Sequence, residues 1–277
     1  MRCNVKFNKV VGLILLYTSC VLADGIKIGV LPYADALKIL NIHQPLKDFL
    51  SSELNQEVQI YTSASYEKFF EDTAKGQFDI IITGPHFGLL HIQDGFVPLV
   101  RYNTNLKPIF VVLKNSGYSK ISDLKNKKIS MSNYLSVSSI AGIKSLIDES
   151  FVNGIDFTLM NYKSHTSAIM SVVLHESDAA ITTHTPIQQL TDENIKSQIR
   201  IIESDFAMPH LFTIANPSLG SNKIVLIKKA LIDFQSSPKG LEFFQKTGYK
   251  SYIDISQKDF DSIQPVLEET KGFLGLK

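Results

Sequence analysis

The sequence predicts an α/β protein built as two lobes with a cleft between them. Short, almost wholly apolar runs alternate with segments of helical periodicity, which is the pattern of a parallel sheet covered by helices on both faces. The alternation begins near residue 26 and starts again near residue 127, so it describes two successive α/β units. Two further β-rich runs, 107–115 and 208–218, bracket the second unit. We expect them to be hinge strands that carry the chain to a second lobe and back.

The first unit is predicted to hold three strands with two helices between them. The predicted strands are 26–32, 57–63 and 78–84, and the predicted helices are 44–55 and 65–76. Pro45 suits the first turn of its helix because proline lacks an N–H that this position would leave unpaired. Gly76 suits the end of the other helix, where the left-handed conformation is common.

The second unit repeats this order, and a helical tail follows it. Its predicted strands are 127–133, 155–163 and 177–184, with helices that begin near Ser136 and His165. The tail, residues 221–269, has helical periodicity and is expected to pack back on the first lobe. We therefore assign 24–107 and 208–277 to the first lobe and 108–207 to the second. Loops at the carboxyl ends of the strands would face the cleft, where open α/β sheets bind ligands.

The first 23 residues predict a secretory signal peptide. Three basic residues open the chain, at Arg2, Lys6 and Lys9. The apolar run 10–16 that follows is too short to span a bilayer. A lipoprotein signal acylated at Cys20 is the alternative, although Tyr17 stands where such signals usually have leucine. We expect an exported mature chain that starts near Asp24.

Charge and cysteine usage exclude several classes of partner. The chain of 277 residues has 28 Lys and Arg against 27 Asp and Glu, and removal of the signal would leave 25 against 27, a net charge of −2. Such a chain has no general attraction for nucleic acid. Cys3 and Cys20 both lie in the predicted signal. The histidines at 165, 175 and 184 lack the spacing of a metal site. We expect no metal, no cofactor and a monomer.

Three serines stand just before an apolar pattern of helical spacing that begins at Ile140. They are Ser136, Ser138 and Ser139. One serine is enough to cap a helix. The first N–H groups of a helix have no internal partner and carry the positive end of its dipole, so an oxyanion binds there, and hydroxyls add donors without adding charge. An ordinary N-cap is the alternative interpretation.

Three segments together resemble the phosphonate-, phosphite- and phosphate-binding periplasmic proteins of ABC importers, the PhnD-like family. The first, "SYEKFFEDTAKGQFDIIITGP", carries the family's Tyr, Gly, Asp and Gly-Pro at Tyr66, Gly76, Asp79, Gly84 and Pro85. The second, "ISDLKNKKISMSNYLSVSSIAG", resembles its "DLKGK" turn, strand and serine-rich loop. The third, "SHTSAIMSVVLHESDAAI", resembles its Ser-His-Asp-Ala helix and following Asp-Ala-Ala strand. The resemblance covers roughly residues 26 to 185.

The resemblance implies a type II periplasmic-binding-protein fold that captures a small oxyanion for a membrane permease without catalysing a reaction. It implies ligand contacts at Ser136, Ser138 and His165. Tyr66 would offer its hydroxyl, or the N–H groups of its helix, from the first lobe; a core aromatic is the alternative. Gly84, Pro85 and His86 end a strand and open a helix, and His86 either faces the ligand or lies at the surface. For His165 the alternative is a capping or surface histidine.

The site departs from the family at three positions. Val137 stands where the family commonly has Thr, and Ser139 replaces a Gly. Thr183 stands where the family commonly has an acidic residue, five positions after Asp178. A carboxylate repels a fully ionised oxyanion and attracts an aminoalkyl group, whereas a threonine does neither. We hypothesise that this site prefers ligands that lack the aminoalkyl cation.

Two other functions fit the same fold. The binding domain could report to a sensor histidine kinase instead of a permease, and docking surfaces leave no motif that separates the two. An enzyme with Ser138 as nucleophile is the second alternative. Ser138 lacks the Gly-x-Ser-x-Gly pattern of a nucleophile elbow, which disfavours a hydrolase.

Overall fold

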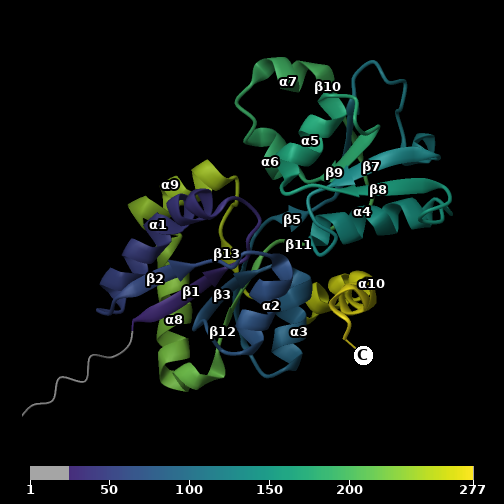
Figure 1. The fold of residues 1–277 in the computed structure, drawn as a ribbon. Coiled ribbons are helices and arrows are strands. Elements are labelled where there is room, and N and C mark those ends of the chain that lie inside the picture. Colours follow the sequence, from purple (N-terminus) through teal and green to yellow (C-terminus); the bar gives the residue numbers. More distant parts are fainter. Residues whose placement is uncertain (1–24, 277) are drawn as a thin grey trace, which may run out of the picture.

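The protein, described by a computed structural model over residues 25–276, folds into two α/β lobes (Figure 1). The predicted signal peptide, with Cys20, lies outside the described residues. The first lobe is built on a six-stranded sheet of order β13-β4-β12-β3-β1-β2. Its strands are β1 Ile26–Val30, β2 Val58–Tyr61, β3 Ile80–Thr83, β4 Val97–Tyr102, β12 Phe212–Ala215 and β13 Tyr252–Ile253.

The second lobe is built on a five-stranded sheet of order β10-β6-β9-β7-β8. Its strands are β6 Ile109–Leu113, β7 Lys127–Met131, β8 Phe157–Asn161, β9 Ala179–Thr182 and β10 Ile199–Glu203. In both sheets the three predicted strands run parallel, and the remaining strands are antiparallel to their neighbours. The prediction of parallel sheets was therefore incomplete: the chain also adds strands where it enters and leaves each lobe.

The chain crosses between the lobes at a two-stranded antiparallel ladder. β5, Asn105–Leu106, pairs with β11, Met208–Pro209. The predicted hinge runs lie at these crossings, but most of each run belongs to a lobe sheet, as β6 in the second lobe and β12 in the first. The exact lobe boundaries stay a prediction.

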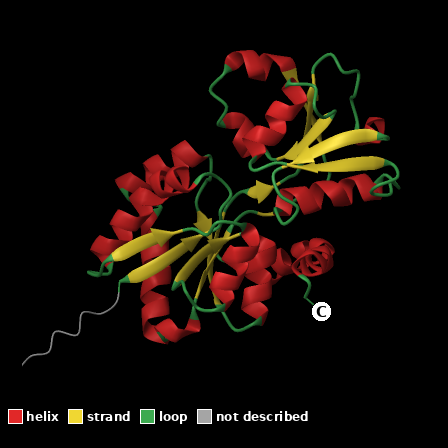
Figure 2. Cartoon of the chain, in the orientation of Figure 1, coloured by secondary structure: helices red, strands yellow, loops and turns green. Residues whose placement is uncertain are grey.

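Helices cover both faces of each sheet (Figure 2). The helices in the segments of the first lobe are α1 Ala36–Glu53, α2 Tyr66–Ala74, α3 Pro85–Gln93, α8 Ser221–Phe234, α9 Pro238–Thr247 and α10 Gln257–Leu274. Those of the second lobe are α4 Val137–Asp148, α5 His165–Val173, α6 His184–Gln188 and α7 Glu193–Gln198. Short 3₁₀ turns lie at Ile121–Leu124 and Pro217–Leu219. Within residues 25–276 no helix is long and apolar enough to cross a membrane.

Helix α1 begins at Ala36, eight residues before its predicted start, and Pro45 lies inside it. Proline removes one hydrogen bond from a helix interior and usually ends or kinks it. Here Ile39 and Leu46, seven residues apart, and Leu50 after them are all buried on one face. Burial of that face on both sides of Pro45 outweighs the local preference. The predicted first-turn position of Pro45 was wrong.

The C-terminal helices pack on the first lobe, as predicted, but the last of them also reaches the second. Helices α8 and α9 contact α1, whereas α10 contacts α3 of the first lobe and α4 of the second. The first lobe's apolar core likewise includes Leu135, Val137 and Ile140 at the start of α4. The two lobes therefore share packed surface on the side of α4 and α10.

Candidate functional site

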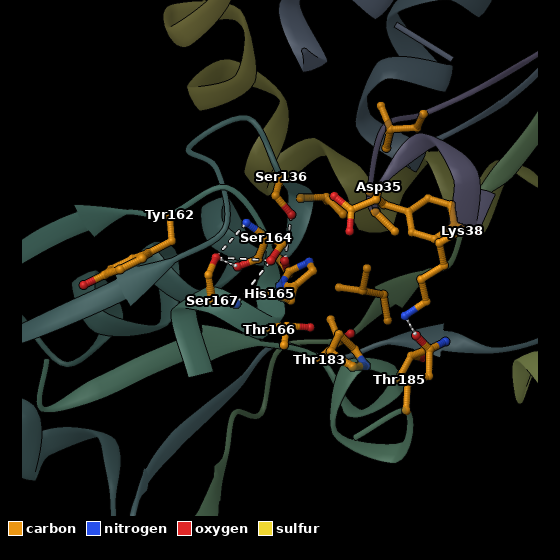
Figure 3. A pocket seen from close by; sticks show the side chains of 18 of the residues that line it. Asp35, Lys38, Ser136, Tyr162, Ser164, His165, Thr166, Ser167, Thr183 and Thr185 are labelled. Carbon is orange, nitrogen blue, oxygen red and sulfur yellow. Dashed lines mark hydrogen bonds between the residues drawn. The ribbon is translucent and has the colours of Figure 1, made fainter. Parts of the chain in front are cut away.

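A cavity of about 600 Å³ lies between the lobes. The first lobe contributes the turn after β1 with the start of α1, and the start of α2. The second lobe contributes the starts of α4, α5 and α6. Three helices of the second lobe thus begin at the cavity, and Figure 3 shows their polar side chains around it. The lining is formed where strands of both sheets end, as expected for an open α/β sheet.

The start of α4 is arranged differently from an ordinary capped helix. Ser136 is the N-cap residue, but its side chain makes no capping bond. Its Oγ instead lies 2.8 Å from Oγ of Ser138, and both side chains line the cavity. The first N–H groups of this 12-residue helix therefore receive no hydroxyl from Ser136. Free N–H groups beside two hydroxyls form a neutral anion-binding surface.

The start of α5 is capped by its own serines. The Ser167 N–H donates to Ser164 Oγ (3.2 Å), and the Ser164 N–H donates to Ser167 Oγ (3.0 Å). These two serines therefore support the helix, although both also line the cavity. At the start of α4, by contrast, the hydroxyls of Ser136 and Ser138 bond to each other and do not cap the helix.

His165, the first residue of α5, lines the cavity as a neutral ring. Its Nδ1 lies 3.1 Å from Thr182 Oγ1, and its Nε2 lies 3.4 Å from Ser132 Oγ. Burial lowers the pKa of this histidine to about 4. The ring is therefore uncharged at neutral pH, and hydroxyls on both sides fix its orientation.

Tyr66 reaches the cavity from the first lobe at the start of α2. Burial raises the pKa of its phenol to about 12, and a hydrogen bond with Ser136 acts in the opposite direction. The phenol stays protonated and can donate. Tyr66 also packs edge-on against Phe87, with 6.5 Å between ring centroids. The two interpretations of Tyr66 are thus not exclusive, because one side of the ring is core and the hydroxyl faces the second lobe.

Of the ten residues predicted from the sequence, six line the cavity and four do not. Those that line it are Tyr66, Ser136, Val137, Ser138, His165 and Thr183; those that do not are Gly84, Pro85, His86 and Ser139. Thr183 is the N-cap residue of α6 and makes no side-chain capping bond. Val137 is buried, and it also belongs to the first lobe's apolar core.

The four residues outside the lining belong to the interior or to the start of a helix. His86 is fully buried, its Nε2 lies 2.9 Å from the Leu135 carbonyl oxygen, and burial lowers its pKa to about 4. A Cβ on Gly84 would lie 2.5 Å from the His86 ring, so the glycine makes room for that ring. Pro85 is the first residue of α3. Ser139 is fully buried, and its Oγ has no hydrogen-bond partner among the described residues.

Several residues of the lining carry no motif in the sequence. Asp35 and Lys38 lie at the start of α1, and Gln189 follows α6. Lys38 Nζ donates to Gln189 Oε1 across the cleft at 2.9 Å. The signal that would have found Asp35 and Lys38 is their place just after β1, at a strand's carboxyl end. They were missed because α1 was expected to begin later.

The side-chain charge around the cavity is sparse. Within the described lining the charged side chains are Lys38, Asp35 and Glu176. His210 also lines the cavity, and burial lowers its pKa to about 4. The start of α4 thus offers a ligand helix N–H groups and hydroxyls but no cationic side chain. No cluster of His, Cys, Asp and Glu suited to a metal ion occurs in the part of the chain that the structure describes.

Two α/β lobes around a cleft lined by helix starts define a type II periplasmic binding protein. Residues 28–260 match the family described as the periplasmic substrate-binding protein of the phosphonate ABC transporter. The chain belongs to this family, whose members bind substrates without catalysis. The resemblance seen in the sequence is thereby confirmed.

Solved structures share the fold at low sequence identity. PhnD1 from Prochlorococcus marinus, in complex with methylphosphonate, is 16% identical with a TM-score of 0.76, covering 90% of this chain and 98% of that one. A binding protein component of an ABC phosphonate transporter from Pseudomonas aeruginosa is 13% identical, with a TM-score of 0.73 and coverage of 90% and 86%. XAC2383 from Xanthomonas citri, bound to ATP, is 14% identical, with a TM-score of 0.70 and coverage of 90% and 96%.

Proposed function

We propose that this protein captures a phosphonate, phosphite or phosphate oxyanion in the periplasm and presents it to the permease of an ABC importer. The observation that carries the proposal is the start of α4, where Ser136 leaves its helix uncapped and turns to Ser138 at the cavity. A tetrahedral oxyanion placed there would accept bonds from helix N–H groups and both hydroxyls. Neutral donors hold an anion less strongly than an arginine fork, which suits a protein that must also release it.

Closure would complete the site from the first lobe. Tyr66 of the first lobe is hydrogen-bonded to Ser136 at the start of α4 and keeps its phenolic proton. An anion bound at the start of α4 would accept a hydrogen bond from the Tyr66 hydroxyl only in the closed state. Binding would therefore stabilise the closed state, which a permease can recognise.

A thermal-shift panel tests the proposal. The compounds are phosphate, phosphite, methylphosphonate, 2-aminoethylphosphonate, sulfate and taurine. A ligand at about 100 times its dissociation constant adds roughly 2.7 kcal/mol to the free energy of unfolding, so a true ligand raises the melting temperature visibly. We expect a shift with at least one phosphorus oxyanion and none with taurine. A flat panel contradicts the proposal.

The panel also tests the hypothesis on Thr183. With threonine at this position, 2-aminoethylphosphonate is expected to bind no more tightly than methylphosphonate. Tight binding of 2-aminoethylphosphonate with far weaker binding of the other oxyanions would refute that hypothesis and leave the oxyanion function intact.

A further inference from the structure

A second cavity, of about 680 Å³, adjoins the cleft. It lies on the first lobe between α1 and α9, which are side by side in Figure 1. Three residues line both cavities: Asp35, Lys38 and Gln189. The two spaces therefore meet at the start of α1, opposite the end of α6.

Two of the three shared residues are joined by a hydrogen bond between the lobes. Lys38 extends from α1 into the cleft (Figure 3). Its Nζ donates to Oε1 of Gln189 in the other lobe. Both residues are exposed, and both side chains are long and flexible. One exposed hydrogen bond contributes little net free energy. A ligand group can therefore separate these side chains and pass between them.

The second cavity offers an apolar wall with its charges already neutralised. Leu37, Ile42, Pro45 and Phe243 all line it. Leu37 is 70% exposed, so its side chain is free to pack against an apolar group in this cavity. The charged residues contributed by α9, Glu242 and Lys246, form an ion pair with each other. Asp35 and Lys38 carry opposite charges where the two cavities meet, so this point favours neither a cationic nor an anionic ligand group.

The volumes of the two cavities also favour a ligand larger than an inorganic oxyanion. Each cavity falls in the range of roughly 300–1,000 Å³ that buries a drug-sized ligand. An inorganic oxyanion or methylphosphonate would fill only the part of the cleft near α4. Apolar side chains, among them Leu31, Met170 and Leu211, line much of the rest.

We propose that the organic substituent of the ligand passes between Lys38 and Gln189 and occupies the second cavity. The ligand class is then an alkylphosphonate or alkyl phosphate monoester with an uncharged chain of several carbons. This rests on the proposed function, because the oxyanion at α4 fixes the end from which the chain extends. Burial of each methylene in the second cavity strengthens binding by about fourfold.

A chain-length series measures this directly. Titration calorimetry on the full mature protein would compare methyl-, butyl- and octylphosphonate, each below the concentration at which it forms micelles. Affinity is expected to rise by more than tenfold from methyl- to octylphosphonate. Octanol, which has the chain but no oxyanion, is expected not to bind. Equal affinity for the three phosphonates overturns the proposal but leaves the proposed function standing, whereas no binding by any of them contradicts both.

A matched pair of variants on α1 tests where the alkyl chain of the ligand binds. Asn41 lines only the second cavity, and Asn41→Trp fills it from an exposed position. In this variant octylphosphonate is expected to bind within about threefold of methylphosphonate, whose affinity serves as the internal reference. Leu40→Trp places the same ring on the same helix outside both cavities and is expected to retain the full gain. If folded Asn41→Trp still binds octylphosphonate far more tightly than methylphosphonate, the alkyl chain lies elsewhere and the proposal is overturned. Circular dichroism checks that the variant is folded.

Discussion

At the scale of single residues, neighbouring serines at the start of α4 differ in surroundings although their residue type is the same. Both Ser138 and Ser139 are buried, but Ser138 lines the cavity beside Ser136 whereas Ser139, the next residue, does not. Helical geometry separates them, because consecutive residues point about 100° apart. Substitution of Ser138 therefore tests the candidate site, and the same substitution at Ser139 serves as its control.

Ser138→Ala is expected to weaken oxyanion binding by roughly 10- to 100-fold, the range expected for one lost hydrogen bond to a charged group. Titration calorimetry with the ligand found in the thermal-shift panel measures the change.

Ser139→Ala serves as the control for that variant. It removes a hydroxyl that has no partner among the described residues, and it is expected to leave the dissociation constant unchanged and the stability equal or higher. Equal losses of affinity in both variants would show that the start of α4 acts as a whole and that Ser138 has no specific role.

At the scale of elements, the packing of α4 on the second lobe's sheet holds the candidate site in place. Gly142 lies in the middle of α4, and a Cβ there would come within 2.5 Å of Ile181 Cγ2 in β9. Glycine is otherwise unfavourable inside a helix. Close approach of helix and strand accounts for it, and this approach sets where the first N–H groups of α4 point.

Gly142→Ala is expected to lower the free energy of unfolding by about 1–3 kcal/mol, the usual effect of overpacking. Because α4 must move away from β9, ligand affinity is expected to fall as well. Urea denaturation and calorimetry measure the two effects.

Gly272→Ala in α10 is the matched control for Gly142→Ala. A Cβ at Gly272 would meet no described atom within 4 Å, and the same substitution there is expected to raise stability by about 0.5–1 kcal/mol. A neutral Gly142→Ala would mean that the α4–β9 contact yields without cost.

The sequence predicted the elements that have a strong local signal. Periodicity located the strands β1, β2, β3, β7, β8 and β9 and the starts of α4 and α5. It failed where tertiary contacts decide: Pro45 argued for a late start of α1, and only burial of residues before it shows otherwise. The consequence reached the site, since Asp35 and Lys38 lie in a stretch that was not expected to be helical.

The predicted site residues divide for a similar reason. Residues at helix starts in the second lobe were placed at the cavity by their position after a strand. His86 holds a comparable position after β3, yet its ring turns to the Leu135 carbonyl in the interior. No local pattern distinguishes these orientations, because the partner lies 49 residues away in the sequence.

At the scale of the whole molecule, buried histidines link stability to pH. Burial lowers the pKa of five histidines to about 4: His43, His86, His91, His165 and His210. In the unfolded chain their pKa is about 6.5. Between these values the unfolded state binds more protons, so stability is fully present above about pH 6.5 and falls as the pH drops towards 4.

The free energy of unfolding is therefore expected to decrease from pH 7.5 to pH 5.5, with each buried histidine adding up to about 1.4 kcal/mol per pH unit to the slope. Urea denaturation at several pH values measures it. His91→Phe is the informative variant, because the ring stacks on Phe70 at 4.4 Å and both its nitrogens lack partners among the described residues. This variant is expected to retain the packing and show a shallower slope; an unchanged slope contradicts the assignment.

The contact of α10 with both lobes has a mechanical consequence. Helix α10 touches α3 and α4 on one side of the molecule, whereas Lys38 and Gln189 meet across the cleft with one hydrogen bond. A body that pivots near one edge moves little at that edge and most at the opposite one. If the lobes rotate about the α10 side, the separation of Lys38 and Gln189 is expected to change more than the contacts of α10. The last helix would then set which edge of the cleft opens.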